Sequence, residues 1–202
     1  MERRSLLVWC AVLTILTIVA IASIDRPLAM ALRDSAPATA ALIHPAIDTV
    51  EVIFGFPLSK WLTGFVILVA ALVALARRAW RPVGWLLLFV AASQLTTRLV
   101  AGVLKNVFLR ARPFENLAGP FFIDGSSFPS GHAAHFWPLY FAAAIAFPRL
   151  RWPLLVLAIL VSIARVAVID HFLSDVTASA ALAALITFGY ARWLRLPRAA
   201  TQ

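Results

Sequence analysis

The sequence predicts an all-α fold, an integral membrane bundle of six transmembrane helices, on three observations. Hydrophobic residues make up 62% of the 202 residues and charged residues only 13%, whereas soluble domains are about half apolar and about a quarter charged. The apolar residues gather in six runs of 16 to 22 residues, close to the roughly 20 residues with which a helix crosses a bilayer. Polar, basic or mixed segments separate these runs.

The first run, residues 5–24, follows the basic start Met1-Glu2-Arg3-Arg4. A cleaved signal peptide is the alternative interpretation, because the small residues Ala20 and Ala22 resemble a cleavage site. We favour an uncleaved helix, since the run is long enough to span the bilayer. The next segment, from Asp25 to Lys60, is mixed in polarity and interrupted by prolines. We expect one or two short helices there, lying at the membrane surface.

Five further apolar runs complete the predicted bundle. A polar loop with Pro and Gly, residues 105–129, separates the third span from the fourth. Because the chain has no evident internal repeat, we expect one domain over residues 1–202. The expected later spans are residues 61–76, 83–104, 132–147, 153–169 and 174–193.

The distribution of charge predicts the orientation of the bundle. Ten of the eighteen Lys and Arg fall at one set of span ends, and eight of the nine acids, all but Glu2, fall on the other side. Cytoplasmic loops are rich in Lys and Arg, so we expect both termini to face the cytoplasm from the cell (inner) membrane. The ten are Arg3, Arg4, Arg77, Arg78, Arg81, Arg149, Arg151, Arg192, Arg195 and Arg198.

Charge and cysteine content argue against other classes of protein. The net charge of +9 does not indicate a nucleic-acid partner, because a DNA-binding face gathers its Lys and Arg on one surface. Here they occur in small clusters between apolar runs. The single cysteine, Cys10, allows neither a disulfide framework nor a thiolate metal cage.

Three polar segments interrupt the apolar sequence: residues 105–113, 129–132 and 165–175. Each lies at the end of an apolar run, and the predicted topology puts all three on the extracytoplasmic side. The charge count does not require this coincidence, so we expect the three segments to form one site. They contain the residues that can hold and attack a phosphate: Lys105, Arg112, Ser130, Gly131, His132, Arg165, His171 and Asp175.

The spacing of His171 and Asp175 puts both side chains on one helix face. A carboxylate on one ring nitrogen fixes the tautomer and leaves the other nitrogen free, so the histidine can act as a nucleophile or a base. A capping pair at the membrane interface is the alternative for this pair alone.

Pro129-Ser130-Gly131-His132 is expected to open a helix, with Ser130 as its N-cap. A helix N-terminus presents free N–H groups to an anion, and His132 in the first turn can donate a proton to a leaving oxygen. An ordinary cap followed by a solvated histidine is the alternative. For Lys105, Arg112 and Arg165 the alternative to phosphate binding is snorkelling at the interface.

Together these segments resemble the type 2 phosphatidic acid phosphatase (PAP2) superfamily of membrane lipid phosphatases. Its signature is K-x6-R-P, then P-S-G-H, then S-R-x5-H-x3-D. Residues 105–113 and 129–132 match the first two parts without exception, and residues 164–175 match the third, except that Ala164 replaces Ser. That departure removes one hydroxyl but no principal catalytic group.

The resemblance implies the reaction and the role of each residue. His171 would attack phosphorus and carry a phosphohistidine, Asp175 would orient it, and His132 would protonate the departing alkoxide and then activate water. Neither a metal nor another cofactor is implied. The phosphate-binding residues would be Lys105, Arg112, Ser130, Gly131 and Arg165.

The implied substrate is a lipid phosphate or diphosphate in the membrane, of the phosphatidic acid, phosphatidylglycerol phosphate, undecaprenyl diphosphate or lipid A type. A phosphotransferase that uses the same site is one alternative. A non-enzymatic membrane transporter or binding protein is another, although the presence of His132, His171 and Asp175 argues against it.

Other polar residues receive structural interpretations. We expect Arg98 to pair with a neighbour inside the bundle and Asp170 to point away from His171. Arg110 is not a signature position, and His135 is expected behind the site. The loop residues Phe114, Phe121, Phe122 and Phe128 are expected to contact lipid chains near the site or to anchor the loop in the membrane interface.

Overall fold

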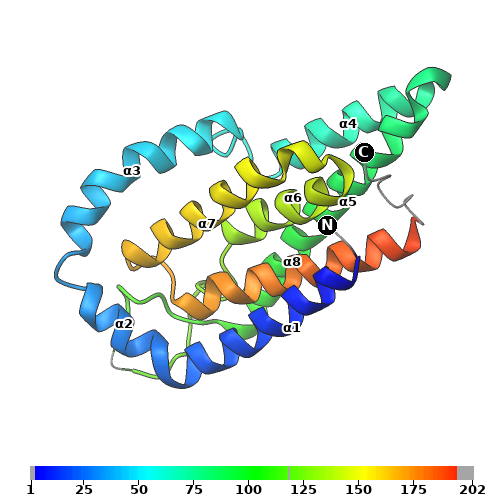
Figure 1. The fold of residues 1–202 in the computed structure, drawn as a ribbon. Helices are drawn as coiled ribbons and strands as arrows, with labels where there is room; N and C mark the ends of the chain where they lie inside the picture. The colour runs from blue at the N-terminus through cyan, green and yellow to red at the C-terminus, as the bar shows by residue number, and fades with distance from the viewer. Residues whose placement is uncertain (1–2, 118, 195–202) are drawn as a thin grey trace.

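In the computed structural model, which describes residues 3–117 and 119–194, the chain folds into helices that run side by side (Figure 1). The helices with their bounds are α1 (Arg3–Val19), the π-helix η1 (Ala20–Ile24), α2 (Asp25–Leu32), α3 (Ala36–Ile53), α4 (Leu62–Ala76), the 3₁₀-helix η2 (Arg78–Trp80), α5 (Arg81–Phe108), α6 (Ala133–Ala146), the 3₁₀-helix η3 (Pro148–Leu150), α7 (Arg151–Ala167) and α8 (Leu173–Trp193).

A helix lies at each of the six expected spans, but the helices differ in length. Among the described residues, four helical stretches are long and apolar enough to cross a membrane: 4–32, 78–108, 148–167 and 173–193. The other two, α4 and α6, have 15 and 14 residues, which is short for a bilayer about 30 Å thick at 1.5 Å per residue. Four spans are therefore supported by length and composition.

The first helical stretch differs from the prediction at its C-terminal end. The expected span ends at residue 24, but the helix continues through η1 into α2. A π-helical turn inserts an extra residue into the α-helical ladder, and such turns are frequent at functional sites. Here it brings Asp25 to the inner side of the bundle, where the side chain is buried.

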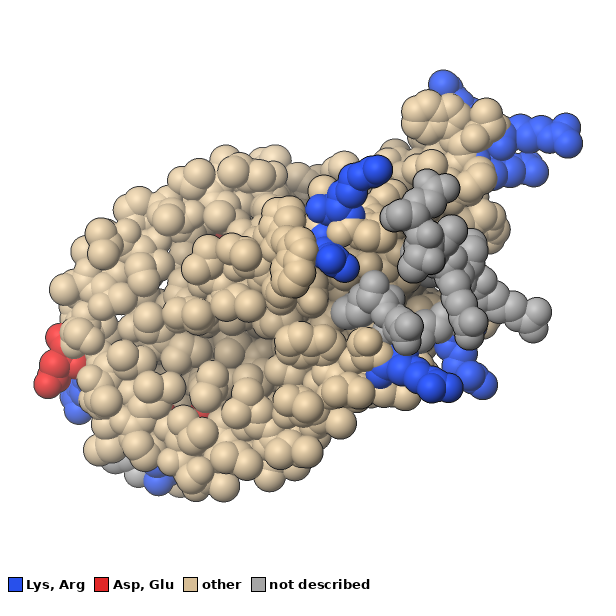
Figure 2. Space-filling model, viewed as in Figure 1, with Lys and Arg blue, Asp and Glu red and all other residues tan. Residues whose placement is uncertain are grey.

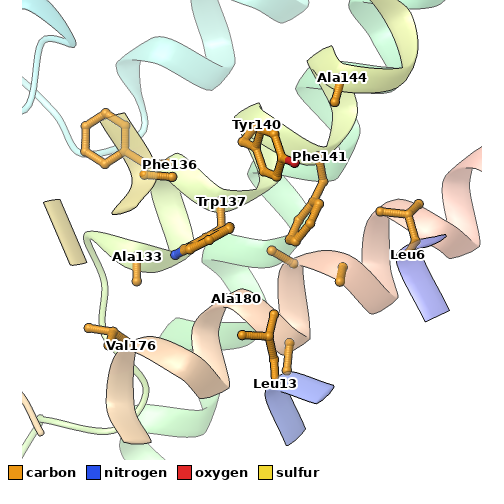
Figure 3. Close-up of a cluster of buried hydrophobic side chains, with 14 of the residues drawn as sticks. Leu6, Leu13, Ala133, Phe136, Trp137, Tyr140, Phe141, Ala144, Val176 and Ala180 are labelled. Carbon is orange, nitrogen blue, oxygen red and sulfur yellow. The ribbon is translucent and has the colours of Figure 1, made fainter. Parts of the chain in front are cut away.

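The core forms where large residues of α6 meet small residues of α8 and the side of α1 (Figure 3). Trp137 and Phe141 of α6 pack together at 5.5 Å between ring centroids. Ala180 of α8 leaves room for them, and Leu6 and Leu13 of α1 close the other side. This packing holds the start of α6 beside the start of α8, where two of the three polar segments lie.

The helix α3 packs against α7 along part of its length (Figure 1). Ile47 is buried, and Val50 and Phe54 contact the core. The rest of the helix is largely exposed, Leu42 by 81%. One end of α3 thus reaches the bundle close to the start of α6.

Charges are segregated along the bundle (Figure 2). The visible Lys and Arg lie mostly over the end that carries the α4–α5 connection and the end of α8, and the visible acids lie at the opposite end, near α2 and α3. This agrees with the arrangement on which the predicted orientation rests. Glu2, Arg195 and Arg198, three of the residues in that count, lie outside the described residues.

Candidate active site

His171 and Asp175 contact one another, but not from one helix face as expected: α8 begins at Leu173, so Asp175 lies in its first turn and His171 in the turn that precedes it. Nδ1 of His171 is 3.3 Å from Oδ2 of Asp175, and the side chains are 2% and 0% exposed. A carboxylate on Nδ1 selects the tautomer with its proton there, so Nε2 keeps its lone pair for nucleophilic attack. Burial lowers the pKa of His171 below its usual value, which favours this neutral form.

The turn that carries His171 has a strained backbone at Ile169. Its φ is 52°, a left-handed conformation that a β-branched residue rarely adopts. The N–H groups of Asp170 and His171 both donate to the carbonyl of Arg165 at 3.1 Å. Such a residue costs about 1–3 kcal/mol and persists only where the surrounding structure enforces it. Here the turn keeps His171 close to Arg165.

Three further donors hold the carboxylate of Asp175. Oδ1 accepts from Nη1 of Arg110 at 2.7 Å. Oδ2 accepts from the N–H of Phe172 at 2.8 Å and from Oγ of Ser127 at 2.5 Å. Because rotation of Asp175 would break all of these bonds, its orientation is fixed, and so is that of the histidine ring bonded to it.

Arg110 is a site residue that the sequence pattern does not reveal. Its side chain is fully buried, and Nη2 lies 2.7 Å from Oδ2 of Asp25. Ser174 completes the network, with Oγ 2.5 Å from the same Asp25 oxygen. The sequence holds one signal for this pairing: Asp25 directly follows an apolar run, and an acid in such a place is expected to have a partner.

Aromatic rings surround the Arg110 guanidinium. Its central carbon lies 4.2 Å from the ring centroid of Phe172 and 4.5 Å from that of Phe121, within the range of a cation–π interaction. Phe122 and Phe128 lie at 5.6 and 5.9 Å. Three of the four loop phenylalanines expected to contact lipid or anchor the loop thus contribute to this enclosure.

The second polar segment meets the third through its backbone. The N–H of Ser130 donates to the carbonyl of Asp175 at 3.0 Å, and Oγ of Ser179 donates to the carbonyl of Ser130 at 2.9 Å. Ser130 is not the N-cap expected from the sequence: α6 begins at Ala133, preceded by His132, and the contact from the Ala133 N–H to Ser130 Oγ is long, at 3.5 Å. The Ser130 side chain points into the protein with no exposed area.

The three predicted cations lie at one end of the bundle. Lys105 is in the last turn of α5, where Nζ donates to the carbonyls of Ser126 and Ser127. Ser127 in turn has Oγ 3.3 Å from Nδ1 of His171. A methyl group added at Gly131 would lie 3.9 Å from Cε of Lys105, so the first two polar segments face one another.

Asp170 bridges the other two cations, a role that the sequence did not predict. Its carboxylate lies 2.8 Å from Nη2 of Arg165 and 3.9 Å from Nη1 of Arg112. Guanidinium groups recognise carboxylate and phosphate oxygens with the same geometry. The two arginines are therefore already arranged around the two oxygens of one anionic group, on the residue next to His171.

His132 has a carboxylate partner that the sequence did not predict. Oε1 of Glu51, near the end of α3, lies 2.6 Å from Nε2 of His132. The ring of His132 also stacks on Phe56, with centroids 5.2 Å apart and planes 9° apart. Burial, followed by the nearby charge of Arg165, lowers the pKa of His132.

Arg98 and His135 lie behind these residues, as expected. Nη1 of Arg98 donates to the carbonyl of Gly131 at 3.2 Å, and Nδ1 of His135 is 2.9 Å from the amide nitrogen of Gln94. Both interactions connect α5 to the start of α6 and so help to hold that start in place. In the part of the chain that the structure describes, no group of three or more His, Cys, Asp and Glu is close enough to hold a metal ion.

Comparisons with known proteins give the family and a related fold. The family model of the PAP2 superfamily matches residues 82–198. A solved structure, that of a transmembrane PAP2-type phosphatidylglycerolphosphate phosphatase from Bacillus subtilis, is similar with a TM-score of 0.56 and 23% sequence identity, over 95% of each chain. At that identity the likeness concerns the fold. No curated protein matches the sequence.

Proposed function

The chain belongs to the PAP2 superfamily, and from this premise we propose that it removes a phosphate from a lipid phosphate or diphosphate through a phosphohistidine at His171. One observation carries the proposal. His171 is held by Asp175 through Nδ1, so that Nε2 is the free nitrogen, at the end of the bundle where Lys105, Arg112 and Arg165 lie. A nucleophile beside three cations is the arrangement that phosphoryl transfer requires, because the reaction depends mostly on positioning and charge stabilisation.

In the first half-reaction, Nε2 of His171 forms a bond to phosphorus while the bond from phosphorus to the lipid oxygen breaks. Lys105, Arg112 and Arg165 balance the negative charge of the phosphoryl oxygens, and the N–H of Gly131 and the hydroxyl of Ser130, which is buried in this structure, donate hydrogen bonds to them. His132 protonates the departing oxygen. Asp175 stabilises the positive charge that develops on His171, as in other pairs of this kind.

In the second half-reaction, His132 takes a proton from water as the water oxygen bonds to phosphorus and the bond to His171 breaks. An acceptor alcohol in place of water would make the protein a phosphotransferase at the same site. Assays for phosphorylated acceptor alongside free phosphate distinguish the two. The three cations supply the charge that a metal supplies elsewhere, so we propose that the reaction is independent of metal.

An apolar cavity supports a substrate with a hydrocarbon tail. It has a volume of about 360 Å³ and lies between α1, α2, α6, α7 and α8. None of the residues proposed to react or to bind phosphate lines it, but Leu173 and Val176, which do, lie within two positions of Asp175 on α8. We therefore propose a substrate whose head group reaches the cations while its tail stays in the membrane, of the phosphatidic acid, phosphatidylglycerol phosphate, undecaprenyl diphosphate or lipid A type.

The test of this function is phosphate release by the purified protein in detergent from a panel of these lipids. We expect release from at least one of them and none from the His171→Ala variant. Equal release by the variant, or none by the unaltered protein, would contradict the proposal.

We also propose that the site faces away from the cytoplasm. A reporter after Gln202, or at Arg149, is then cytoplasmic, and a reporter within residues 115–125 is extracytoplasmic. The measurement is the activity of a compartment-dependent reporter in cells. A cytoplasmic signal from residues 115–125 would reverse the orientation.

A further inference from the structure

The helix α3 carries a polar face that the proposed mechanism does not use. His44, Asp48 and Glu51 are spaced four and three residues apart, so they share one face of the helix. His44 and Asp48 are exposed, while Glu51 is half-buried against the start of α6. Glu51 lies outside residues 82–198, the part that the family model matches.

Glu51 occupies one nitrogen of the second histidine of the site. Oε1 of Glu51 lies 2.6 Å from Nε2 of His132. Among the described residues, this is the hydrogen bond that the His132 ring makes. The stack on Phe56 restricts rotation of the ring. Nδ1 is therefore the nitrogen left to exchange a proton with a reacting oxygen.

We propose that Glu51 is the proton-holding partner of His132: its carboxyl group supplies the proton that His132 passes to the leaving oxygen, and it takes the proton back when water is activated. This inference rests on the proposed function and adds a positioning residue to it, because Glu51 acts through His132 and does not touch the substrate.

Burial of the pair favours a proton on Glu51. Burial raises the pKa of Glu51, partly offset by Arg165. Burial lowers the pKa of His132, and the charges of Arg165, His171 and Arg98 act in the same direction. Asp48 and His44, which lie on α3 itself, have opposing effects on Glu51, and His135 on α6 also lowers the pKa of His132. Both pKa shifts are consistent with one arrangement: the protonated carboxyl group of Glu51 donates to Nε2 of His132, and the neutral ring carries its own proton on Nδ1.

The proton transfers then balance. As the bond from phosphorus to the lipid oxygen breaks, Nδ1 gives its proton to that oxygen and the Glu51 proton moves to Nε2, which leaves the carboxylate charged and the ring neutral. In the second step water gives a proton to Nδ1 as its oxygen bonds to phosphorus. The Nε2 proton returns to Glu51, so the pair ends as it began.

The partial exposure of the pair suits this role. The Glu51 and His132 side chains are 26% and 18% exposed, so the carboxyl group can also exchange its proton with water between turnovers.

The test compares Glu51→Gln with Asp48→Asn, a matched loss of one acid from the same helix face. Two substrates are used in detergent: a lipid phosphate that the unaltered protein hydrolyses, whose alkoxide needs a proton, and p-nitrophenyl phosphate, whose leaving group does not. We expect kcat of Glu51→Gln on the lipid to fall about 100-fold, a typical contribution of proton transfer, with little change on the aryl phosphate. Asp48→Asn should match the unaltered protein on both, and Glu51→Asp should recover part of the lipid activity.

The pH profile supplies a readout that a merely structural role would not change. The pair donates only while it holds its proton, so activity is lost as pH rises through its pKa. Without the carboxyl group the proton must reside on His132 alone, whose pKa is lowered, so the alkaline limb should move to lower pH in Glu51→Gln. The double variant with His132→Ala should lose no more activity than His132→Ala, because the two residues act as one unit.

Equal losses of Glu51→Gln on both substrates, or an unmoved alkaline limb, would overturn the inference. NMR titration of the protein labelled at histidine makes the test independent of turnover. The His132 signal should titrate at a lower pH in Glu51→Gln than in the unaltered protein, and at the same pH in Asp48→Asn. An unchanged His132 titration in Glu51→Gln refutes the pairing. A shifted titration in a protein that releases no phosphate from any lipid supports the pairing and refutes the proposed function instead.

Discussion

The two histidines of the site have carboxylate partners in contrasting surroundings. His171 and Asp175 are 2% and 0% exposed, whereas His132 and Glu51 are 18% and 26% exposed. Asp175 is held by several donors, from the residue before α8 and from the loop between α5 and α6, while the described side-chain partner of Glu51 is His132. One half of the site is rigid and closed, and the other is accessible.

The difference follows from what each histidine must do. A nucleophile attacks along one line, so its ring gains from a fixed orientation. A group that gives and takes protons must reach the leaving oxygen, then water, and must recover its proton between turnovers. The fixed half is built on α8 and the buried Arg110, whereas the accessible half depends on α3, most of which is exposed.

Loss of the nucleophile should have the largest effect. His171→Ala should abolish both phosphate release and the phosphoenzyme, because the imidazole proposed to attack phosphorus is removed. Acid-quench trapping with radiolabelled substrate measures both, and His44→Ala, an exposed histidine, is the control. Labelled phosphohistidine in the His171→Ala variant would show that the assignment of the two halves is wrong.

Loss of the accessible histidine should have a smaller effect that depends on the substrate. His132→Ala should slow hydrolysis of a lipid phosphate about 10²–10⁴-fold, the usual range for acid–base catalysis. With an aryl phosphate as substrate, this variant should recover much of the rate of the first half-reaction. Phosphoenzyme should then accumulate, because the base for its hydrolysis is also lost. The measurement is phosphoenzyme level against phosphate release on both substrates. The same loss on both would remove the functional distinction between the histidines.

The contribution of the buried network should appear as a difference in the free energy of unfolding between variants at Arg110 and at Arg112. Arg110→Met leaves Asp25 and Asp175 buried without their cation, and breaking such a pair costs about 3–5 kcal/mol. Arg112→Met should cost no more than about 1 kcal/mol, as expected for a partly exposed ion pair, and should act on substrate binding instead. Unfolding of the two variants in detergent gives the comparison. Equal stability would mean that the Arg110 network does not hold the closed half together.

The smallest effect is expected from removal of metal. If cations of the chain supply all the charge at phosphorus, activity should be unchanged in EDTA, while vanadate should inhibit as a mimic of five-coordinate phosphorus. Phosphate release with each additive is the measurement. Activity lost in EDTA and restored by Mg²⁺ would place a metal in the mechanism of both halves.

The sequence by itself determined the helices and the family. Apolar runs long enough for helices, and charges sorted between their ends, require no knowledge of packing. The three motifs carry His171, Asp175 and the cations at recognisable spacings. The sequence also predicted the His171–Asp175 contact, but from a shared helix face, whereas His171 lies in the turn before α8 and reaches Asp175 from there.

Only the tertiary structure decided which distant residues complete the site. Asp25 and Arg110 are 85 residues apart, and Glu51 and His132 are 81 apart, so neither pair has a spacing that a pattern can reveal. The same holds for Asp170, which lies next to His171 but is directed to Arg165 and Arg112 by the left-handed turn at Ile169. These contacts depend on how α2, α3 and the long loop pack against α6 and α8, and a buried charge takes whichever partner that packing supplies, because leaving it unpaired would cost several kcal/mol.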